Sequence, residues 1–198
     1  MATSVDPDRI LLLAVPSSCA PSDRRALRGG AELSLDKRDE VWDAEVHVVP
    51  PTGEAHQDLS DEFFLVVAPL AEKRGLVPRT EGGLHRTADD YRIPDQLYRR
   101  PEHRADHGAT GAELVLEIRS PRDQTSAKIS FYAAMGVQEM IILHPDDRRV
   151  ELLRSVEGRP VSTQPDTEGA FTSTVLGITL RSVAGKLRIT WPEGSAEI

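Results

Sequence analysis

The sequence has little cysteine, few aromatic side chains and no long apolar run. Cys19 is the single cysteine among 198 residues, which excludes an internal disulfide framework and a cysteine-rich zinc site. A lone thiol is typical of a reducing compartment. No apolar run approaches the roughly 20 residues of a membrane-spanning helix, and the short run 10–15 follows Asp6 and Asp8, whereas a signal peptide begins with basic residues. These absences predict a cytoplasmic protein with no membrane segment.

The chain also lacks an excess of positive charge. Its formal net charge is -8 at pH 7, and affinity for phosphate comes largely from lysine and arginine. The composition therefore argues against a strongly basic nucleic-acid-binding protein, but it leaves open an enzyme with a locally positive groove. Apolar residues make up 39% of the chain and charged residues 28%, as in soluble globular proteins, and the length suits one domain with a full core.

The expected organisation is one domain between two less structured ends. Residues 1–40 are of mixed charge and are interrupted by residues such as Pro16 and Pro21, so we expect a loosely structured N-terminal segment. Residues 41–191 carry the periodic apolar patterns and are expected to form the domain. Residues 192–198 are expected to be a tail.

Apolar periodicity predicts the strands and helices of the domain. Nearly continuous apolar residues over 112–118 and 139–143 are typical of strands buried on both faces, and a period of 3.6 residues over 56–74 and 126–135 is typical of helices. The strand–helix–strand order favours a right-handed parallel crossover. Further extended segments are expected at 43–49, 91–93, 96–98, 150–154, 171–175 and 178–181. We expect an α/β fold in which the later strands complete a mixed central β-sheet flanked by helices.

One carboxylate in an apolar strand stands out chemically. Glu117 lies near the end of the strand 112–118, where an ionised group is costly unless a cation or hydrogen-bond donors face it. Ligands of α/β proteins bind beyond the carboxyl ends of the strands. A second carboxylate, Asp95, would complete an oxygen-rich site for Mg²⁺, which uses one or two carboxylates and keeps several waters. Lys128, in the first turn of the next helix, would orient or deprotonate a water and stabilise charge on a phosphate.

The same residues also fit structural roles. Glu117 could form a salt bridge with Arg119 or Lys128. Asp95 follows Pro94, a position typical of turn residues. The residue types alone therefore leave a metal site and a set of structural contacts as alternatives.

A longer motif surrounds the glutamate. Residues 117–121 read Glu-Ile-Arg-Ser-Pro, and the pattern K-x-x-x-Y-x-x-x-G-V runs from Lys128 to Val137. This block resembles the bacterial Uma-two family of restriction endonucleases, which belongs to the PD-(D/E)xK nuclease superfamily. The resemblance covers roughly residues 43–181.

Other residues extend the resemblance towards the N-terminus. Pro94 and Asp95 resemble the PD element of the family. Glu45 and His56 resemble its early strand and the histidine near the start of its first helix, although these two positions are weaker matches. The resemblance implies a restriction-endonuclease-like core.

The resemblance also implies roles for individual residues. Asp95 and Glu117 would be metal ligands, and together with Lys128 they would be the catalytic residues. Arg119 stands two residues after the glutamate, so the active-site lysine is displaced to the following helix. The implied function is an endonuclease that hydrolyses phosphodiester bonds in nucleic acid, with DNA as the expected substrate. The implied cofactor is Mg²⁺, with Mn²⁺ as an alternative. Cutting of both strands by so small an enzyme implies a homodimer.

Two departures keep another function open. Gln124 stands where many relatives have an acidic residue four positions before the lysine, and Asp123 lies one step earlier. The loop between Ser120 and the lysine is also short. The alternative is a catalytically inactive module on the same fold, used for nucleic-acid binding or protein interaction.

A histidine metal site is a separate rival. His103, Asp106 and His107 have a helical spacing that can hold zinc. Pro101 and Gly108 flank them, however, and predict a loop. The sequence contains no glycine-rich phosphate-binding loop.

Overall fold

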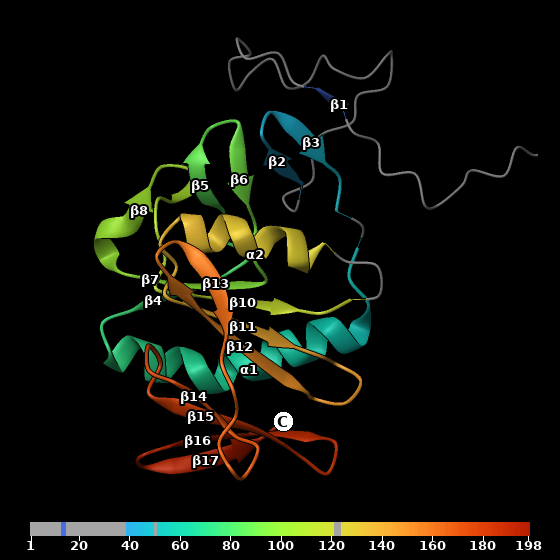
Figure 1. The fold of residues 1–198 in the computed structure, drawn as a ribbon, viewed down its shortest axis with the longest axis vertical. Coiled ribbons are helices and arrows are strands. Elements are labelled where there is room, and N and C mark those ends of the chain that lie inside the picture. Colours follow the sequence, from blue (N-terminus) through green and yellow to red (C-terminus); the bar gives the residue numbers. More distant parts are fainter. Residues whose placement is uncertain (1–12, 15–38, 50, 121–123) are drawn as a thin grey trace, which may run out of the picture.

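The computed structural model describes residues 13–14, 39–49, 51–120 and 124–198. The segment 1–40, expected to be loosely structured, lies outside the described residues except at 13–14 and 39–40, and Asp123 lies outside them as well. The described part contains a six-stranded sheet, a four-stranded sheet, a seven-stranded sheet of short strands and two α-helices (Figure 1). None of its helices combines the length and apolar character needed to cross a membrane.

The six-stranded central sheet is mixed, as the sequence predicts. Its strands are β4 (Val77–Thr80), β7 (Gln96–Arg99), β10 (Leu114–Ile118), β11 (Glu139–Leu143), β12 (Val150–Val156) and β13 (Arg159–Ser162). The order is β13-β12-β11-β10-β7-β4, with β10 and β11 parallel and the other neighbours antiparallel. Helix α2 (Thr125–Ala134) connects β10 to β11, which confirms the predicted parallel crossover.

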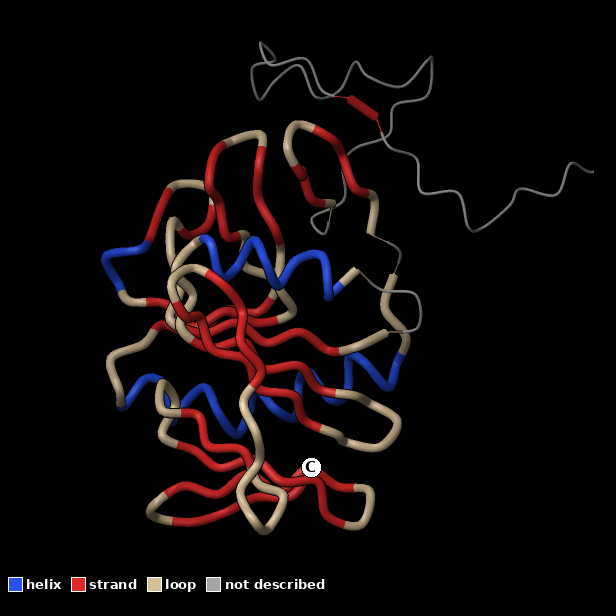
Figure 2. The backbone as a smooth tube through the Cα atoms, in the orientation of Figure 1, coloured by secondary structure: helices blue, strands red, loops and turns tan. Residues whose placement is uncertain are grey.

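Helix α1 (Glu54–Lys73) and helix α2 cover opposite faces of the central sheet (Figure 2). Side chains alternate along a strand. Leu116 of β10 therefore belongs to the same buried cluster as Phe63 of α1, whereas Val115 packs in a second cluster with the aromatic side chains of α2. Glu117 lies two residues after Val115 and so points to the α2 face.

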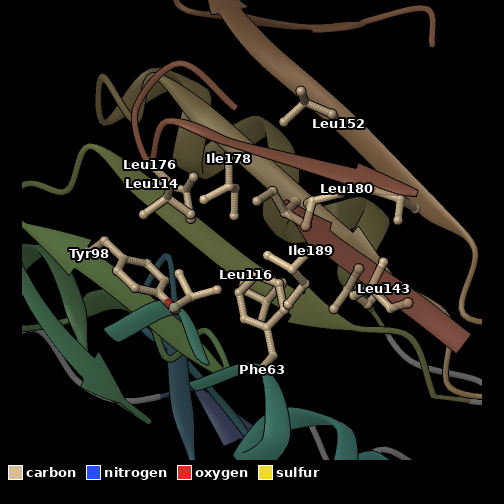
Figure 3. Close-up of a cluster of buried hydrophobic side chains, with 14 of the residues drawn as sticks. Phe63, Tyr98, Leu114, Leu116, Leu143, Leu152, Leu176, Ile178, Leu180 and Ile189 are labelled. Atoms are coloured by element: carbon tan, nitrogen blue, oxygen red, sulfur yellow. The ribbon is translucent and has the colours of Figure 1, made fainter. Parts of the chain in front are cut away.

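The strands after residue 170 form a second sheet. They are β14 (Phe171–Ser173), β15 (Ile178–Val183), β16 (Lys186–Trp191) and β17 (Gly194–Glu197), all antiparallel in this order. The expectation that the later strands complete the central sheet is therefore wrong. Leu180 and Ile189 are buried with Phe63 on the α1 side of the core (Figure 3). Because only one face of these strands is apolar, they pack as a separate layer.

A buried carboxylate joins the two sheets. Glu139, the first residue of β11, is 1% exposed and accepts five hydrogen bonds. Its partners include the hydroxyls of Ser173 at 2.5 Å and Thr174 at 2.7 Å, and the Nε of Arg154 at 3.3 Å. This carboxylate is fully satisfied by the protein, and its role is structural.

The third sheet contains a hairpin that the sequence did not predict. Its strands are β1 (Leu13–Ala14), β2 (Glu40–Trp42), β3 (Glu45–His47), β5 (Leu84–Thr87), β6 (Asp90–Arg92), β8 (Arg104–Ala105) and β9 (Gly108–Ala109). The single strand expected at 43–49 is wrong in its first residues, because Asp43 and Ala44 form the turn between β2 and β3 with φ of 48° and 70°. Hairpin turns of this kind usually contain Asn or Gly, which are absent here.

The two helices match their predicted ranges closely. Helix α1 begins two residues before the expected start and continues through Pro69. Gly75 follows it with a φ of 75°, a conformation that favours glycine. Helix α2 differs from its predicted bounds by one residue at each end.

Candidate active site

The structure brings Asp95, Glu117 and Lys128 together at one end of the central sheet. Glu117 is the fourth residue of β10, Lys128 lies in the first turn of α2, and Asp95 directly precedes β7. The Nζ atom of Lys128 is 3.5 Å from Oε1 of Glu117. Oδ2 of Asp95 accepts a hydrogen bond of 2.7 Å from the backbone N–H of Ile118, the residue after Glu117. Three separate elements thus supply one cluster.

Glu117 is a buried carboxylate in an acidic setting. It is 5% exposed, and the hydroxyl of Tyr132 donates to its Oε1. Burial raises the pKa of Glu117 to about 8; the charge of Lys128 opposes this rise, and the charges of Asp95 and Glu40 add to it. Glu139 accepts two backbone N–H bonds in addition to its side-chain donors, whereas the contacts of Glu117 are the side chains of Tyr132 and Lys128. A buried carboxyl group with a strongly raised pKa is a candidate for a functional site.

Lys128 is held by a residue that sequence reasoning missed. Its Nζ lies 2.8 Å from Oε1 of Glu40, which is 1% exposed. Glu40 also accepts hydrogen bonds of 2.7 Å from the backbone N–H of Ile93 and from Nε1 of Trp42, so its position is fixed on both oxygens. Burial alone would lower the pKa of Lys128, but the carboxylates of Glu117, Glu40 and Asp95 outweigh it and raise the pKa. Lys128 is therefore an ammonium group.

His56 connects Asp95 to the end of strand β10. Its Nε2 lies 2.9 Å from Oδ1 of Asp95, and its Nδ1 lies 2.8 Å from Oγ of Ser120. An ionised carboxylate only accepts hydrogen bonds, so Nε2 donates to Asp95, and Nδ1 shares a second hydrogen bond with the serine hydroxyl. The imidazole therefore fixes the orientation of Asp95.

The remaining sequence candidates lie outside this cluster. Glu45 is exposed on β3, and the site carboxylate of this hairpin is Glu40. Gln124 contacts His47, with Oε1 and Nδ1 3.2 Å apart. Arg119 donates to Oγ of Ser126 at 3.3 Å.

Part of the structural alternative is also present. The salt bridge between Glu117 and Lys128 that the sequence left open exists at 3.5 Å. Within the described ranges, no group of three or more His, Cys, Asp or Glu side chains is arranged to hold a metal ion. This finding covers the stretch around His103, Asp106 and His107 as well as the cluster around Glu117.

The charge balance of the cluster nevertheless fits a divalent cation. When Glu117 is ionised, the carboxylates of Glu40, Asp95 and Glu117 face the one ammonium of Lys128, which leaves an excess of two negative charges. Carboxylate oxygens are the ligands that Mg²⁺ prefers. Both oxygens of Glu40 already contact Lys128, Ile93 or Trp42, so Asp95 and Glu117 are the residues that would hold the ion. A bound cation would also favour the ionised form of Glu117.

Comparison with known proteins gives a family and a fold. The family model Uma2 (Uma-two above), described as "Putative restriction endonuclease", matches residues 31–184. The crystal structure of a putative nuclease belonging to DUF820 from Anabaena variabilis ATCC 29413 is similar to the chain, with a TM-score of 0.59 and 16% sequence identity. The similarity covers 73% of this chain and 86% of that chain. The predicted restriction-endonuclease-like α/β fold is thereby confirmed.

A second solved structure gives a weaker match. The cryo-electron-microscopy structure of a DrdV–DNA complex has a TM-score of 0.35 and 18% identity, over 54% of this chain and 10% of that chain. A score this low bears on neither fold nor function. No curated protein matches the chain.

Proposed function

The chain belongs to the Uma2 family of restriction-endonuclease-like proteins, and we propose that it is a divalent-metal-dependent endonuclease that hydrolyses phosphodiester bonds in nucleic acid. The observation that carries the proposal is the convergence of Asp95, Glu117 and Lys128 from three elements on one buried, acid-rich cluster. Without a cation, Glu117 keeps a proton up to about pH 8, whereas a bound divalent ion would compensate the two negative charges of the fully ionised cluster. We propose DNA as the nucleic acid that it cleaves.

Each side chain of the cluster has a proposed task. Asp95 and Glu117 would hold Mg²⁺, or Mn²⁺ in its place, and the ion would polarise the phosphate and lower the pKa of a bound water. The hydroxyl of Tyr132 fixes one oxygen of Glu117, and His56 fixes Asp95. These contacts pre-orient both carboxylates, which lowers the cost of assembling the reactive geometry.

Lys128 acts as a cation in this mechanism. The surrounding carboxylates raise its pKa, so it does not take a proton from the attacking water near neutral pH. Its ammonium group instead orients the water and stabilises the negative charge that develops on the phosphate oxygens. The ion pair with Glu40 keeps Nζ beside Glu117 while this happens.

The wider setting is also proposed. We propose a homodimer, because cutting both strands of a duplex takes two such sites. We also propose that the protein is cytoplasmic. We propose that the functional unit spans residues 41–191 together with Glu40, whose carboxylate holds Lys128. It also includes β17, because the expected tail 192–198 contains this strand and β17 pairs with β16.

A catalytically inactive nucleic-acid-binding module is the second candidate. The observation that favours it is the contact of both Lys128 and Tyr132 with the same oxygen of Glu117. If these contacts persisted in the presence of divalent ions, the ammonium of Lys128 would neutralise Glu117 in place of a metal ion. The two candidates differ in whether the cluster binds a divalent ion and cleaves.

Cleavage of supercoiled plasmid DNA with Mg²⁺ tests the proposal. Glu117→Gln and Lys128→Met should each lower the rate at least about 100-fold, and EDTA should abolish cleavage. Glu45→Gln is the matched control, because Glu45 is exposed on the neighbouring hairpin; it should cleave like the wild type. Circular dichroism of each variant checks the fold. Equal residual cleavage in all proteins would contradict the proposal.

A further inference from the structure

Three arginines gather beside the central sheet without an acidic partner. Arg79 lies on β4, Arg99 on β7 and Arg104 on β8. Among the described residues, every arginine that forms an ion pair is a different one. In a chain with a net charge of -8, acidic partners are abundant, so an unpaired cluster of cations points to an anion from outside.

The pairing of β4 with β7 puts two of these arginines on one face. Arg79 lies opposite Leu97, and Arg99 is two residues beyond Leu97 on the same strand. Their side chains therefore point to the same side of the sheet, with Cβ atoms roughly 7–8 Å apart. Leu97 packs with the apolar residues of α2, so this is the face that carries Glu117.

Arg99 donates to the protein through one of its two terminal nitrogens. The residue is 6% exposed, and its Nη1 donates to the backbone oxygens of Arg100 at 3.0 Å and Pro101 at 3.3 Å. Burial and the positive charges of Arg79 and Arg104 lower the pKa of Arg99. An anion bound near the three arginines would offset the repulsion between their positive charges and accept hydrogen bonds from their guanidinium groups.

Strand β7 leads from this cluster to the proposed active site. Asp95 precedes the strand and Arg99 ends it, so four residues at about 3.3 Å each separate them by roughly 13 Å. One strand of a duplex covers this distance in about four nucleotides, at roughly 3.4 Å each. Asp61 and Glu81 line the small pocket beside Asp95 and would repel a polyanion there. Because all four residues of β7 are buried, a polyanion would reach the proposed site over the exposed Arg79 and Arg104 and not over the strand itself.

We propose that Arg79, Arg99 and Arg104 form a binding surface for the phosphates of the nucleic-acid backbone. The proposal rests on the proposed function, which supplies nucleic acid as the substrate. Arginine suits this task because its planar donors match phosphate oxygens in pairs. Such contacts position the substrate independently of its sequence, and they weaken as salt concentration rises.

Binding can be measured separately from cleavage. Glu117→Gln protein in EDTA is titrated into a fluorescein-labelled DNA duplex, and anisotropy gives the affinity at several salt concentrations. The double variant Arg79→Gln, Arg104→Gln changes two exposed side chains and spares the buried Arg99. It should weaken binding about ten-fold or more at low salt and reduce the salt slope by about two. Arg159→Gln is the matched control, since Arg159 is an exposed arginine on β13 at the opposite edge of the sheet; it should bind like the parent.

Three results would overturn the proposed surface. The first is an unchanged affinity and salt slope in the double variant, and the second is an equal loss in the Arg159→Gln control. The third is equally tight binding of poly-glutamate of the same charge, because this would assign the surface to acidic proteins. Plasmid cleavage by the wild type is judged separately, so the proposed function can stand when the surface fails, and the surface can stand when cleavage fails.

Discussion

Glu40 and Lys128 form an ion pair of 2.8 Å that connects the β2–β3 hairpin to the first turn of α2. The other contacts of the Glu40 carboxylate come from Ile93 and Trp42, so the glutamate is rigid and the lysine follows its position. The guanidinium of Arg92 packs 4.4 Å from the Trp42 ring centroid and extends this support. The hairpin therefore belongs to the candidate site as much as the motif around Glu117 does.

This pair gives the first prediction. Glu40→Gln should lower the single-turnover cleavage rate at least about ten-fold, because Lys128 loses the charge that fixes its ammonium beside the phosphate. Affinity for the metal should change far less, since Glu40 is not a proposed ligand. Glu54→Gln, at the start of α1, serves as the control. A cleavage rate equal to that of the wild type would show that Lys128 does not depend on Glu40.

The buried Glu117 predicts an unusual dependence of stability on pH. Its pKa rises from 4.5 to about 8 on folding, so between these values the folded protein keeps a proton that the unfolded chain has lost. The contribution of this group to stability is therefore complete below about pH 4.5 and is lost progressively as the pH rises to about 8.

Glu117→Gln isolates this effect. Urea unfolding in EDTA should show the variant gaining stability over the wild type as the pH rises through this window, and the difference should level off above it. Glutamine resembles the protonated acid in size and does not titrate. A difference that stays constant from pH 4 to pH 9 would mean that Glu117 is not a perturbed carboxyl group.

His56 supports a third prediction. His56→Ala should weaken binding of Mn²⁺ about 10- to 100-fold, because Asp95 loses one of the two donors that fix its orientation and keeps only the backbone N–H of Ile118. Gln57→Ala is the control on the same helix, where the side chain bonds to the exposed Asp61. Isothermal titration of both variants gives the affinities. Equal affinity in the two variants would remove His56 from the site.

The local parts of the fold could be predicted from the sequence. The block from 114 to 143 is read correctly because each of its elements has a clear apolar period and because parallel strands require a crossover. Periodicity does not say which sheet a strand joins. That is why Leu180, which faces the core from a second layer, was assigned to the central sheet.

The candidate site was predictable only where its residues are close in sequence or carry a motif. Glu117 and Lys128 belong to one motif, and the resemblance added Asp95. Glu40 reaches Lys128 through a hairpin whose turn at Asp43 has positive φ without Asn or Gly, so no turn signal pointed to it. The signal available in the sequence was a glutamate directly before the apolar pair Val41 and Trp42.

Direct metal binding tests the central claim most closely. Titration of Mn²⁺ into the wild type should show a divalent-ion site that Asp95→Asn and Glu117→Gln each weaken at least about ten-fold. Glu45→Gln, with its exposed carboxylate, should bind like the wild type. Binding that is absent from the wild type, or that is the same in all four proteins, would contradict the assignment of Asp95 and Glu117 as metal ligands.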